Sequence, residues 1–411
     1  MNILILGHGG REHALVDIIK KSSHTSQLFV LNGNPRMKKD AINLTGLETK
    51  ESILSICKNH HIDLVIPGGE SYLSDGITDE LISHGITCFG PTQKASFIES
   101  SKAYAKLIME KYDIPTASYQ KFYDSKDALS YLHKLTPPYV IKYDGLALGK
   151  GVTVTSDIDE ATQIIKLFLD KKIYGNDGVL IEEFLYGKEY SMIAAVHEKT
   201  VVALPVARDH KSRYDDNQGP NTGGMGAYSP VDFVTEDTYK LSLDILNKCA
   251  LGMYNENNAF TGFLYGGFIL TEKGPKVIEF NCRLGDPEAE VILPRIKTDF
   301  VELLLSVLSH QPISPIIDPD YQLGVVMVSD GYPNDYRKGY DIQIDSSVEQ
   351  NVYHMGTAVI DDKLVTHGGR VLLVRGTGKT LLDAHKEVYR KIDKIVCHHL
   401  RYRYDIGKYN L

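Results

Sequence analysis

The sequence has few cysteines, and their placement excludes two common ways of holding a fold together. Only five occur in 411 residues, and no two of them form a CxxC pair. They are Cys57, Cys88, Cys249, Cys282 and Cys397. An odd number of scattered cysteines indicates neither a zinc site nor a disulfide framework. We therefore expect a protein of the reducing cytoplasm.

The chain also lacks an excess of basic residues and any long apolar run. Its net charge of −8 argues against a general nucleic-acid or membrane-surface binder. No apolar stretch is long enough to span a bilayer, and we expect no signal peptide because a strand begins at once. The composition is that of a globular protein with room for about two to four domains. We expect small-molecule partners, no nucleic acid, no membrane, and a monomer or weak homodimer.

A strand, a glycine turn and a helix open the chain and resemble the start of a dinucleotide-binding fold. Gly7 and Gly9 match the first two glycines of that fingerprint, but Glu12 occupies the third position. A turn of this kind still presents free N–H groups to an anion, and basic neighbours would reinforce it. We interpret it as a site for a small phosphorylated ligand. The alternative is a tight turn that only lets strand and helix pack.

Strands and helices alternate through the first 100 residues. Strands are predicted at 27–31, 63–70 and 86–90, with helices at 52–59 and 76–83. This alternation is typical of a doubly wound parallel sheet. Ligands bind at the carboxyl ends of such strands. The candidates at those ends are Gly9, Gly10, Asn34 and Glu70.

A short buried strand followed by a glycine-rich loop offers a second phosphate site. The strand delivers Lys142, and three glycines and Lys150 lie in the loop beyond it. Such a loop can fold its N–H groups around phosphates while the lysines supply point charges. It is not a Walker P-loop, because Gly151 stands where Ser or Thr is required. The alternative is a glycine hairpin with a surface lysine.

Two later stretches also suggest contacts with a nucleotide or substrate. Glu182 and Glu189, on either side of a turn, could accept from a nucleotide's amino or hydroxyl groups; the alternative is a pair of ordinary edge charges. Residues 209–226 are rich in charge, Gly and Asn and have almost no apolar content. A passive connector need not be so long, so we predict a long ordered loop or a lid.

The stretch 276–288 carries a metal-binding pattern. In a strand, Glu279 and Asn281 point to the same face. A carboxylate and an amide oxygen are hard oxygen ligands of the kind that Mg²⁺ takes. Arg283 would share that face, so phosphate oxygens would meet two metal ligands and a guanidinium. The alternative is a half-buried strand whose polar side faces water.

The remaining elements complete a multidomain chain. Helices are predicted at 97–112, 235–257 and 291–310, and the segments 262–270 and 275–281 are predicted to pair as strands. A small third domain begins near residue 321. Its strands are predicted at 323–329, 356–360 and 370–374, and its final helix at 381–396. The sequence does not specify the chemistry of this last domain.

Seven motifs in order resemble those of the ATP-grasp superfamily and, within it, the phosphoribosylamine–glycine ligase (glycinamide ribonucleotide synthetase) family. They are Gly-His-Gly-Gly-Arg-Glu-His-Ala-Leu at 7–15, Phe-Gly-Pro at 89–91, Ser-Lys at 101–102, Asp-Gly-Leu-Ala-Leu-Gly-Lys-Gly-Val at 144–152, Glu-Glu-Phe-Leu-Tyr-Gly-Lys-Glu-Tyr-Ser at 182–191, Gly-Pro-Asn-Thr-Gly-Gly-Met-Gly-Ala-Tyr-Ser-Pro at 219–230 and Glu-Phe-Asn-Cys-Arg-Leu-Gly-Asp-Pro-Glu at 279–288. Any one could arise by chance, but seven in order are specific.

The resemblance implies an α/β and α+β multidomain fold. An N-terminal doubly wound parallel sheet, of the pre-ATP-grasp type, would occupy residues 1–100. A central ATP-grasp domain would follow at 101–320, with a mobile lid subdomain at about 115–190. A small C-terminal mixed β/α domain, rich in strands, would occupy 321–411.

The resemblance also implies the reaction. ATP phosphorylates the carboxylate of glycine to glycyl phosphate, and the amine of 5-phosphoribosylamine attacks it, giving glycinamide ribonucleotide, ADP and phosphate in de novo purine biosynthesis. Mg²⁺ or Mn²⁺ would assist. One alternative is a paralogous ATP-grasp carboxylate–amine ligase with a shifted amine or acid substrate. Alternatives of other classes are a nicotinamide-dependent oxidoreductase, suggested by the first 30 residues, and a non-catalytic nucleotide-binding module.

The resemblance assigns roles to individual residues. The catalytic residues would be Arg283, Lys142 and Asp209. ATP would be bound by Lys102, Lys142, Gly145, Lys150, Gly151, Glu182, Glu183, Leu185 and Glu189. The other substrates would be bound by Gly9, Gly10, Arg11, Glu12, His13, Asn34, Glu70, Asp209, Lys211, Asn221, Thr222, Gly223, Gly224, Met225, Arg283 and Asp286. The metal ligands would be Glu279 and Asn281.

Several positions depart from the family pattern. Most of them fall on the side that the resemblance gives to the amine substrate, at Arg36, Tyr72, Ser212 and Asn217. Tyr143 and Leu148 replace alanines of the phosphate loop. Residues 265–267 read Tyr-Gly-Gly where many ATP-grasp enzymes carry an acidic metal ligand, so the number of metal ions stays open.

Overall fold

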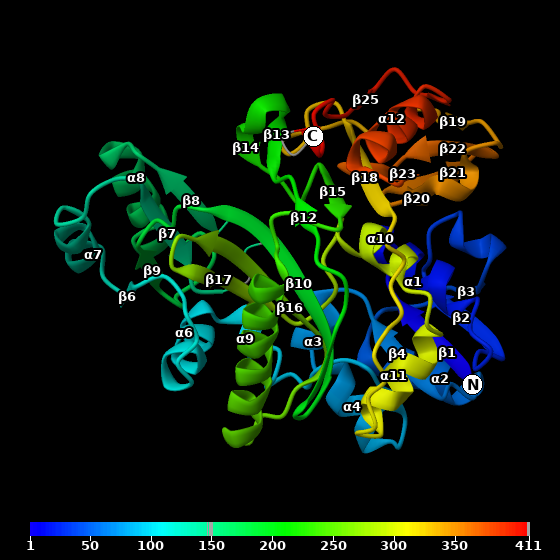
Figure 1. Ribbon diagram of the computed structural model, residues 1–411, viewed down its shortest axis with the longest axis horizontal. Coiled ribbons are helices and arrows are strands. Elements are labelled where there is room, and N and C mark those ends of the chain that lie inside the picture. Colours follow the sequence, from blue (N-terminus) through cyan, green and yellow to red (C-terminus); the bar gives the residue numbers. More distant parts are fainter. Residues whose placement is uncertain (146, 148–150, 409–411) are drawn as a thin grey trace.

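The computed structural model describes residues 1–145, 147 and 151–408. Figure 1 shows the N-terminal sheet and the C-terminal elements side by side at one end of the molecule. A small sheet with two helices lies at the opposite end, and a long antiparallel sheet joins the two ends. Within the described residues, no helix has both the length and the apolar character needed to cross a membrane.

The N-terminal unit is a five-stranded parallel sheet of order β3-β2-β1-β4-β5, which confirms the doubly wound prediction. Its strands are β1 (Asn2–Leu6), β2 (Gln27–Leu31), β3 (Ile42–Leu44), β4 (Leu64–Pro67) and β5 (Thr87–Cys88). Its helices are α1 (Gly10–Ile19), η1 (Met37–Lys39), α2 (Lys50–Asn59), α3 (Glu70–Ser74) and α4 (Ile77–Ser83). Ile3 and Ile5 pack on one face of β1 and Leu4 and Leu6 on the other, because both faces are covered. The sequence did not predict β3 or α3, which are too short to show a period.

The helix predicted at 97–112 is two helices, α5 (Phe97–Ser100) and α6 (Lys102–Lys111). Ser101 between them is extended, with φ −126° and ψ 109°, and its hydroxyl caps α6 by accepting from the N–H of Tyr104. The single-helix prediction was wrong for this reason. The break places Lys102 in the first turn of α6.

The central sheet is antiparallel, with order β11-β10-β16-β17. Its strands are β10 (Lys188–His197), β11 (Thr200–Ala203), β16 (Thr261–Thr271) and β17 (Gly274–Asn281), and α9 (Glu236–Asn255) packs against it. The predicted pairing of the last two strands is confirmed. A register shift opposite Ile278 interrupts the alternation of β17, so Phe268 pairs with Val277 and Gly267 with Glu279.

A second antiparallel sheet, of order β6-β9-β7-β8, has a core of its own. It consists of β6 (Tyr119–Phe122), β7 (Tyr139–Tyr143), β8 (Val152–Thr155) and β9 (Val179–Glu182), with α7 (Ser125–Leu132) and α8 (Ile158–Leu169). In Figure 1 this unit stands apart from the rest at the left.

The helix predicted at 291–310 is also interrupted. The structure has α10 (Ala289–Ile292), the short η3 (Leu293–Arg295) and α11 (Phe300–Leu308). Pro294 has no N–H to donate to a continuing helix, and Asp299 starts a new one by accepting from the N–H groups of Val301 and Glu302.

The C-terminal unit is built on a sheet of order β12-β15-β18-β23-β20, with β25 also paired to β18. Its later strands are β18 (Tyr321–Ser329), β20 (Val352–His354), β23 (Arg370–Gly378) and β25 (Leu400–Arg401); smaller elements are β19 (Gln343–Ile344), η4 (Glu349–Asn351), β21 (Thr357–Ile360), β22 (Lys363–Thr366) and β24 (Ile395–Val396). Its helix, α12 (Leu381–Ile392), ends four residues before the predicted limit because β24 follows.

Two strands of the C-terminal sheet come from earlier in the chain. They are β12 (Arg208–Asp209) and β15 (Gly226–Ser229). Between them lie the hairpin of β13 (Ser212–Tyr214) and β14 (Gln218–Asn221) and the turn η2 (Asp215–Asn217). The predicted loop at 209–226 is therefore ordered and tied at both ends to the C-terminal sheet.

Candidate active site

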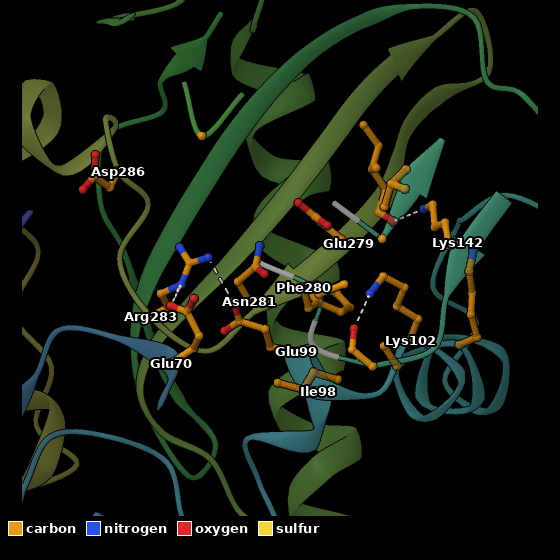
Figure 2. Close-up of a pocket in the computed structure, with 18 of the residues that line it drawn as sticks. Glu70, Ile98, Glu99, Lys102, Lys142, Glu279, Phe280, Asn281, Arg283 and Asp286 are labelled. Carbon is orange, nitrogen blue, oxygen red and sulfur yellow. Dashed lines mark hydrogen bonds and ion pairs between the residues drawn. The ribbon is translucent and has the colours of Figure 1, made fainter. Parts of the chain in front are cut away.

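A cavity of about 360 Å³ lies where three parts of the molecule meet. They are the sheet of β6, β9, β7 and β8, which we call the lid from here on, the strand β17 and the N-terminal unit. Figure 2 shows side chains from all three parts pointing into it. Many residues expected from the sequence line it: Arg11, Glu70, Lys102, Lys142, Gly145, Gly151, Glu182, Gly223, Glu279, Asn281, Arg283 and Asp286. Polar lining residues that the sequence did not indicate are Glu99, Lys106 and Arg370.

Two lysines converge on one buried carboxylate at the lid side of the cavity. Lys142 Nζ lies 3.0 Å and Lys106 Nζ 3.4 Å from Glu182 Oε2. Lys142 also donates to the carbonyl of Ile278 on β17, which joins the lid to the central sheet. Burial lowers the pKa of Lys106 to about 8, although Glu182 opposes the shift. Lys106 follows Lys102 by four residues in α6, so helical spacing was the signal that could have revealed it.

Lys102 reaches the cavity from the start of α6. Its Nζ donates to the carbonyl of Gly145 at 3.1 Å. Asp144 next to it holds α6 and the lid together, because its Oδ1 accepts from Ser101 Oγ and from the N–H of Ala103. Burial lowers the pKa of Lys102, and the carboxylate of Glu279 acts against that shift. Lys102 is thus set between the loop after β7 and the strand β17.

Glu279 and Asn281 both face the cavity from the end of β17 (Figure 2). Among the described residues, the Glu279 carboxylate has no hydrogen bond or ion pair within bonding distance. Burial alone would raise its pKa, but the nearby charges of Lys211, Lys142 and Lys102 lower it. The carboxylate is therefore ionised and free to bind a cation.

Gly267 lies opposite Glu279 on β16. A Cβ built there would stand 3.4 Å from Glu279 Cγ, so a side chain at 267 would be a direct neighbour of the carboxylate. Because this position is glycine, β16 adds no third acidic ligand beside the pair. The two oxygen donors of β17 suit Mg²⁺ or a similar hard cation.

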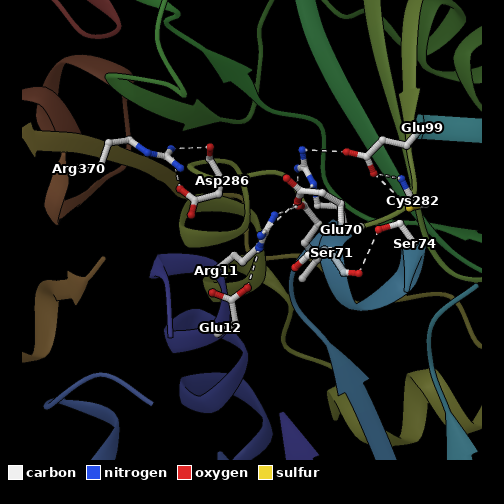
Figure 3. Close-up of polar contacts among 11 residues, drawn as sticks. Arg11, Glu12, Glu70, Ser71, Ser74, Glu99, Cys282, Asp286 and Arg370 are labelled. Atoms are coloured by element: carbon white, nitrogen blue, oxygen red, sulfur yellow. Dashed lines mark hydrogen bonds and ion pairs between the residues drawn. The ribbon is translucent and has the colours of Figure 1, made fainter. Parts of the chain in front are cut away.

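The opposite end of the cavity holds two guanidinium groups around one carboxylate (Figure 3). Arg283 Nε lies 3.0 Å and Arg11 Nη2 3.7 Å from Glu70 Oε2. Arg283 also contacts Glu99 at 3.1 Å. Burial would raise the pKa of Glu70, but Arg283 and Arg11 outweigh it and keep the carboxylate ionised. The two fixed guanidinium groups suit a carboxylate or phosphate ligand.

A residue of the C-terminal unit, Arg370, lines the same end of the cavity. Arg370, on β23, donates to the carbonyls of Gly223 and Asp286 at 2.7 Å each, and it lies 2.8 Å from Asp286 Oδ1. Figure 3 shows this contact on the far side of Asp286 from Arg11. One side chain therefore ties the loop at 221–224 and the segment after β17 to the C-terminal sheet.

A charged cluster beside the cavity holds other expected residues. Lys211 lies 3.3 Å from Glu189, and its pKa is raised well above its usual value chiefly by Asp209. Glu288 is buried and accepts from the hydroxyl of Tyr265 at 2.9 Å. Burial and the charge of Asp209 raise the pKa of Glu288 to about 7. The charge of Lys211 lowers the pKa of Glu279, but no residue of this cluster is among the lining residues of the cavity that the structure describes.

Several expected substrate residues lie at the junction of the N- and C-terminal units instead. His13 Nδ1 accepts from the N–H of His354, and burial lowers the pKa of His13 well below its usual value. Asn34 Nδ2 donates to the carbonyls of His8 and His354. Glu12 is buried and contacts Arg11 at 2.7 Å. The contacts of His13 and Asn34 with His354 join the two units, whereas Glu12 and Arg11 both belong to the N-terminal unit. The predicted binding roles stay predictions.

The other expected residues are placed as follows. Gly9 and Gly10 form the turn at the start of α1 without lining the cavity. Glu183 contacts Lys276 and Ser118 at the surface. Lys150 lies outside the described residues. The remaining ones that do not line the cavity are Leu185, Asn221, Thr222, Gly224 and Met225.

The departures from the family pattern lie away from the cavity. Arg36 contacts Asp40 at 2.8 Å, and Tyr72 is buried in the core of the N-terminal unit. The backbone carbonyl of Ser212 and the side-chain oxygen of Asn217 both accept from Arg403. Tyr143 packs in the lid core against Phe168 and Tyr174 and donates to Asp177. None of these five side chains is among the lining residues that the structure describes, and Leu148 lies outside the described residues.

Comparison with known proteins agrees with this architecture. Three family models match the chain: Phosphoribosylglycinamide synthetase N domain at residues 1–99, its ATP-grasp (A) domain at 100–289 and its C domain at 322–409. The chain is 40% identical to a phosphoribosylamine–glycine ligase of Lactococcus lactis over 99% of both chains. It is 42% identical to one of Halalkalibacterium halodurans, over 99% of this chain and 96% of that one.

Solved structures extend the likeness. A crystal structure of phosphoribosylamine–glycine ligase from Thermotoga maritima matches with a TM-score of 0.88 and 34% identity, over 99% of this chain and 100% of that one. The biotin carboxylase domain of a Hydrogenobacter thermophilus 2-oxoglutarate carboxylase shares the fold alone, at a TM-score of 0.74 and 15% identity over 97% and 91% of the two chains. The chain therefore belongs to the phosphoribosylglycinamide synthetase family.

Proposed function

We propose that the protein is an ATP-dependent phosphoribosylamine–glycine ligase that forms glycinamide ribonucleotide, ADP and phosphate. The observation that carries the proposal is the convergence of three groups in one cavity: the lysines of the lid side, the oxygen ligands of β17 and the paired guanidinium groups. The first two suit a nucleoside triphosphate with its metal ion, and the third suits an anionic co-substrate. Relatives at 40% to 42% identity carry the same name.

The lid side of the cavity would bind the triphosphate. Lys102 and Lys142 present two ammonium groups to phosphate oxygens, and Lys142 is already held in place by Glu182 and the carbonyl of Ile278. Phosphoryl transfer depends on positioning and on neutralising charge more than on a base. Glu182 Oε1 is buried and has no hydrogen-bond partner among the described residues, so it would accept a hydrogen bond from the nucleotide.

Glu279 and Asn281 would hold the divalent ion. When bound there, Mg²⁺ or Mn²⁺ would neutralise charge on the phosphate oxygens during transfer. The chain's own contribution is to keep the Glu279 carboxylate ionised through Lys211, Lys142 and Lys102 and to present both oxygens from one rigid strand.

The guanidinium end would bind the acceptor substrates. Glycine must place its carboxylate in line with the γ-phosphate, and Arg283 lies between the metal ligands and Glu70. The carboxylate oxygen attacks the γ-phosphorus to give glycyl phosphate and ADP. The amine of phosphoribosylamine then attacks the carbonyl carbon, and phosphate leaves. A water-accessible site would hydrolyse the acyl phosphate, so the lid must exclude water.

The positions of the departures favour phosphoribosylamine over a shifted amine. Arg36, Tyr72, Ser212 and Asn217 are all engaged in contacts away from the cavity. Changes at these positions can therefore be accommodated without altering the groups that meet the acceptor. We also propose small-molecule substrates and a place in the cytoplasm, because the relatives at 40% to 42% identity are named as a ligase of glycine and phosphoribosylamine.

An omitted-substrate assay tests the proposal. ADP release is measured with MgATP, glycine and phosphoribosylamine, and then with each acceptor omitted in turn. We expect full turnover only with both, and a product with the mass of glycinamide ribonucleotide. Turnover that needs neither acceptor, or that continues with a different amine in place of phosphoribosylamine, would contradict the assignment.

A further inference from the structure

Outside the cavity, two imidazoles and a carboxylate meet at one end of the central sheet. His197 is the last residue of β10, Glu198 lies in the turn that follows, and His310 lies just beyond α11. One possible ligand atom from each of the three lies within 4.8 Å of the other two. The two rings stand 4.8 Å apart between centroids, and a ring nitrogen of His310 lies 3.7 Å from Glu198.

Threonine hydroxyls orient both imidazoles. His197 Nδ1 lies 2.9 Å from Thr261 Oγ1, and His310 Nδ1 lies 2.9 Å from Thr200 Oγ1. If each Nδ1 carries the proton and donates to the hydroxyl, each Nε2 presents a bare lone pair. Histidine ligands of metal ions characteristically have their second ring nitrogen held by such a partner, which fixes the tautomer and the ring direction.

The backbone around the cluster is fixed as well. His197 pairs in register with Thr200 on β11 and with Thr261 on β16, so three neighbouring strands carry His197 and the two supporting threonines. The N–H of Glu198 donates to the carbonyl of Phe260 at 2.8 Å, which holds the turn against β16. His197 is therefore held by the sheet and Glu198 by the turn that follows it, whereas His310 lies in the turn after α11.

The geometry points to a binding site for a divalent transition-metal ion of the zinc class, held by His197, Glu198 and His310. Two imidazole nitrogens and one carboxylate oxygen form a donor set that such ions take, with water in the fourth position. Bonds of about 2.1 Å in a tetrahedral arrangement place ligand atoms about 3.4 Å apart. The side chains of His310 and Glu198 are 49% and 38% exposed, so they can close the remaining distance by rotation.

The ion would connect two segments that are far apart in the sequence. β10 and β11 are neighbouring strands of the central sheet, and α11 packs against both of them just before the chain enters the C-terminal unit. A metal bound at the cluster would clamp the turn after β10 to the end of α11. We therefore expect a structural effect, since none of the three residues lines the cavity that the described residues form.

Calorimetric titration of metal-free protein with ZnCl₂ tests the site. Because Glu279 and Asn281 can also bind a divalent ion, the titration is done in the Glu279→Gln background. His310→Asn is the test variant, since asparagine tolerates the positive φ of 57° at this position. His133→Ala, at an exposed histidine after α7, is the matched control. Circular dichroism checks that each variant is folded.

We expect one zinc ion per chain in Glu279→Gln, unchanged when His133→Ala is added. Adding His310→Asn should weaken binding at least about tenfold and abolish the zinc-dependent rise in melting temperature. Thr261→Val, which removes only the hydroxyl at His197, should weaken it by about tenfold as well. Absence of zinc binding in Glu279→Gln, or equal binding with and without His310→Asn, would overturn the inference. Neither result would bear on the ligase activity, so the two proposals fail separately.

Discussion

At the scale of single residues, the site depends on a few charges whose ionisation is set by their neighbours. Glu279 is kept ionised by lysines from three different segments, whereas Glu288 close by is held toward its protonated form by burial and by Asp209. Two carboxylates of one short stretch thus differ in charge state near neutral pH. This difference suits one to bind a cation and the other to remain in the protein interior.

Removal of the Glu279 charge gives the clearest test at this scale. Glu279→Gln should lower turnover by at least about two orders of magnitude, on the order of 3 kcal/mol, because one metal ligand is lost from the transition state. The measurement is steady-state ADP release with both acceptors present. Glu272→Gln, at an exposed glutamate after β16, is the matched control and should retain nearly full turnover. Turnover of Glu279→Gln close to that of the parent protein would remove Glu279 from the site.

Glu288 makes the stability depend on pH. Its pKa is about 7 in the folded protein against an ordinary value of 4.5, so the folded state binds more protons between those values. The stabilisation is complete below about pH 4.5 and is lost as the pH rises through about 7, with a magnitude on the order of 3 kcal/mol. Glu288→Gln should therefore reduce the loss of stability between about pH 5 and about pH 8 in urea denaturation. The exposed Glu272→Gln should leave that loss unchanged; an equal loss in all three proteins would contradict the assignment.

Some residue-scale features could be predicted from the sequence and others could not. Glu279 and Asn281 were predicted because two residues of a strand share a face whatever the tertiary structure. Lys106 had a local signal in its spacing from Lys102. Arg370 had none, because its place in the cavity depends on a sheet in which β15 pairs with β18 about 100 residues later and β18 pairs with β23 about 50 residues later.

At the scale of elements, the break between α5 and α6 positions the first lysine of the site. Ser101 caps α6 and also donates to Asp144, so one hydroxyl fixes both the helix start and its attachment to the lid. The sequence favoured one continuous helix, because the apolar period runs through both. The capping serine was the signal that could have shown the break.

Ser101→Ala should weaken both connections. Loss of the cap costs about 1 kcal/mol of unfolding free energy, measured by urea denaturation. The KM for ATP should rise as well, because Lys102 lies in the first turn of α6, which loosens when the cap is lost. Ser130→Ala, at an exposed position within α7, removes a hydroxyl that caps no helix and serves as the control. A variant with unchanged stability and unchanged KM would show that Ser101 does not position Lys102.

At the scale of the whole molecule, three sheets meet at the cavity and a fourth supports it. The strand pairing of β12 and β15 with β18 makes the C-terminal unit part of the site's framework. The predicted elements of this unit agree with the structure in broad outline, but the sequence indicated no role for the unit in the active site. Non-local pairing of this kind leaves no local pattern, so it could not be predicted without the structure.

Arg370 is the point where the C-terminal unit acts on the site. Arg370→Ala should lower kcat/KM for the acceptors by about thirtyfold, on the order of 2 kcal/mol, because Asp286 and the carbonyl of Gly223 lose a charged donor. The KM for ATP should change little, since Arg370 lies at the other end of the cavity. Arg370→Lys should not restore activity, because a single ammonium cannot reproduce the planar fork. Arg390→Ala, on the exposed side of α12, is the control; equal kinetics in the two alanine variants would contradict the role.

The central claim is that glycine is activated as an acyl phosphate within this cavity, and an oxygen label tests it most directly. Glycine with ¹⁸O at both carboxylate oxygens is ligated with MgATP and phosphoribosylamine, and the released phosphate is analysed by mass. The account predicts that each phosphate carries one ¹⁸O, because the carboxylate oxygen that attacks the γ-phosphorus leaves with it. Phosphate free of the label, at full turnover, would contradict it.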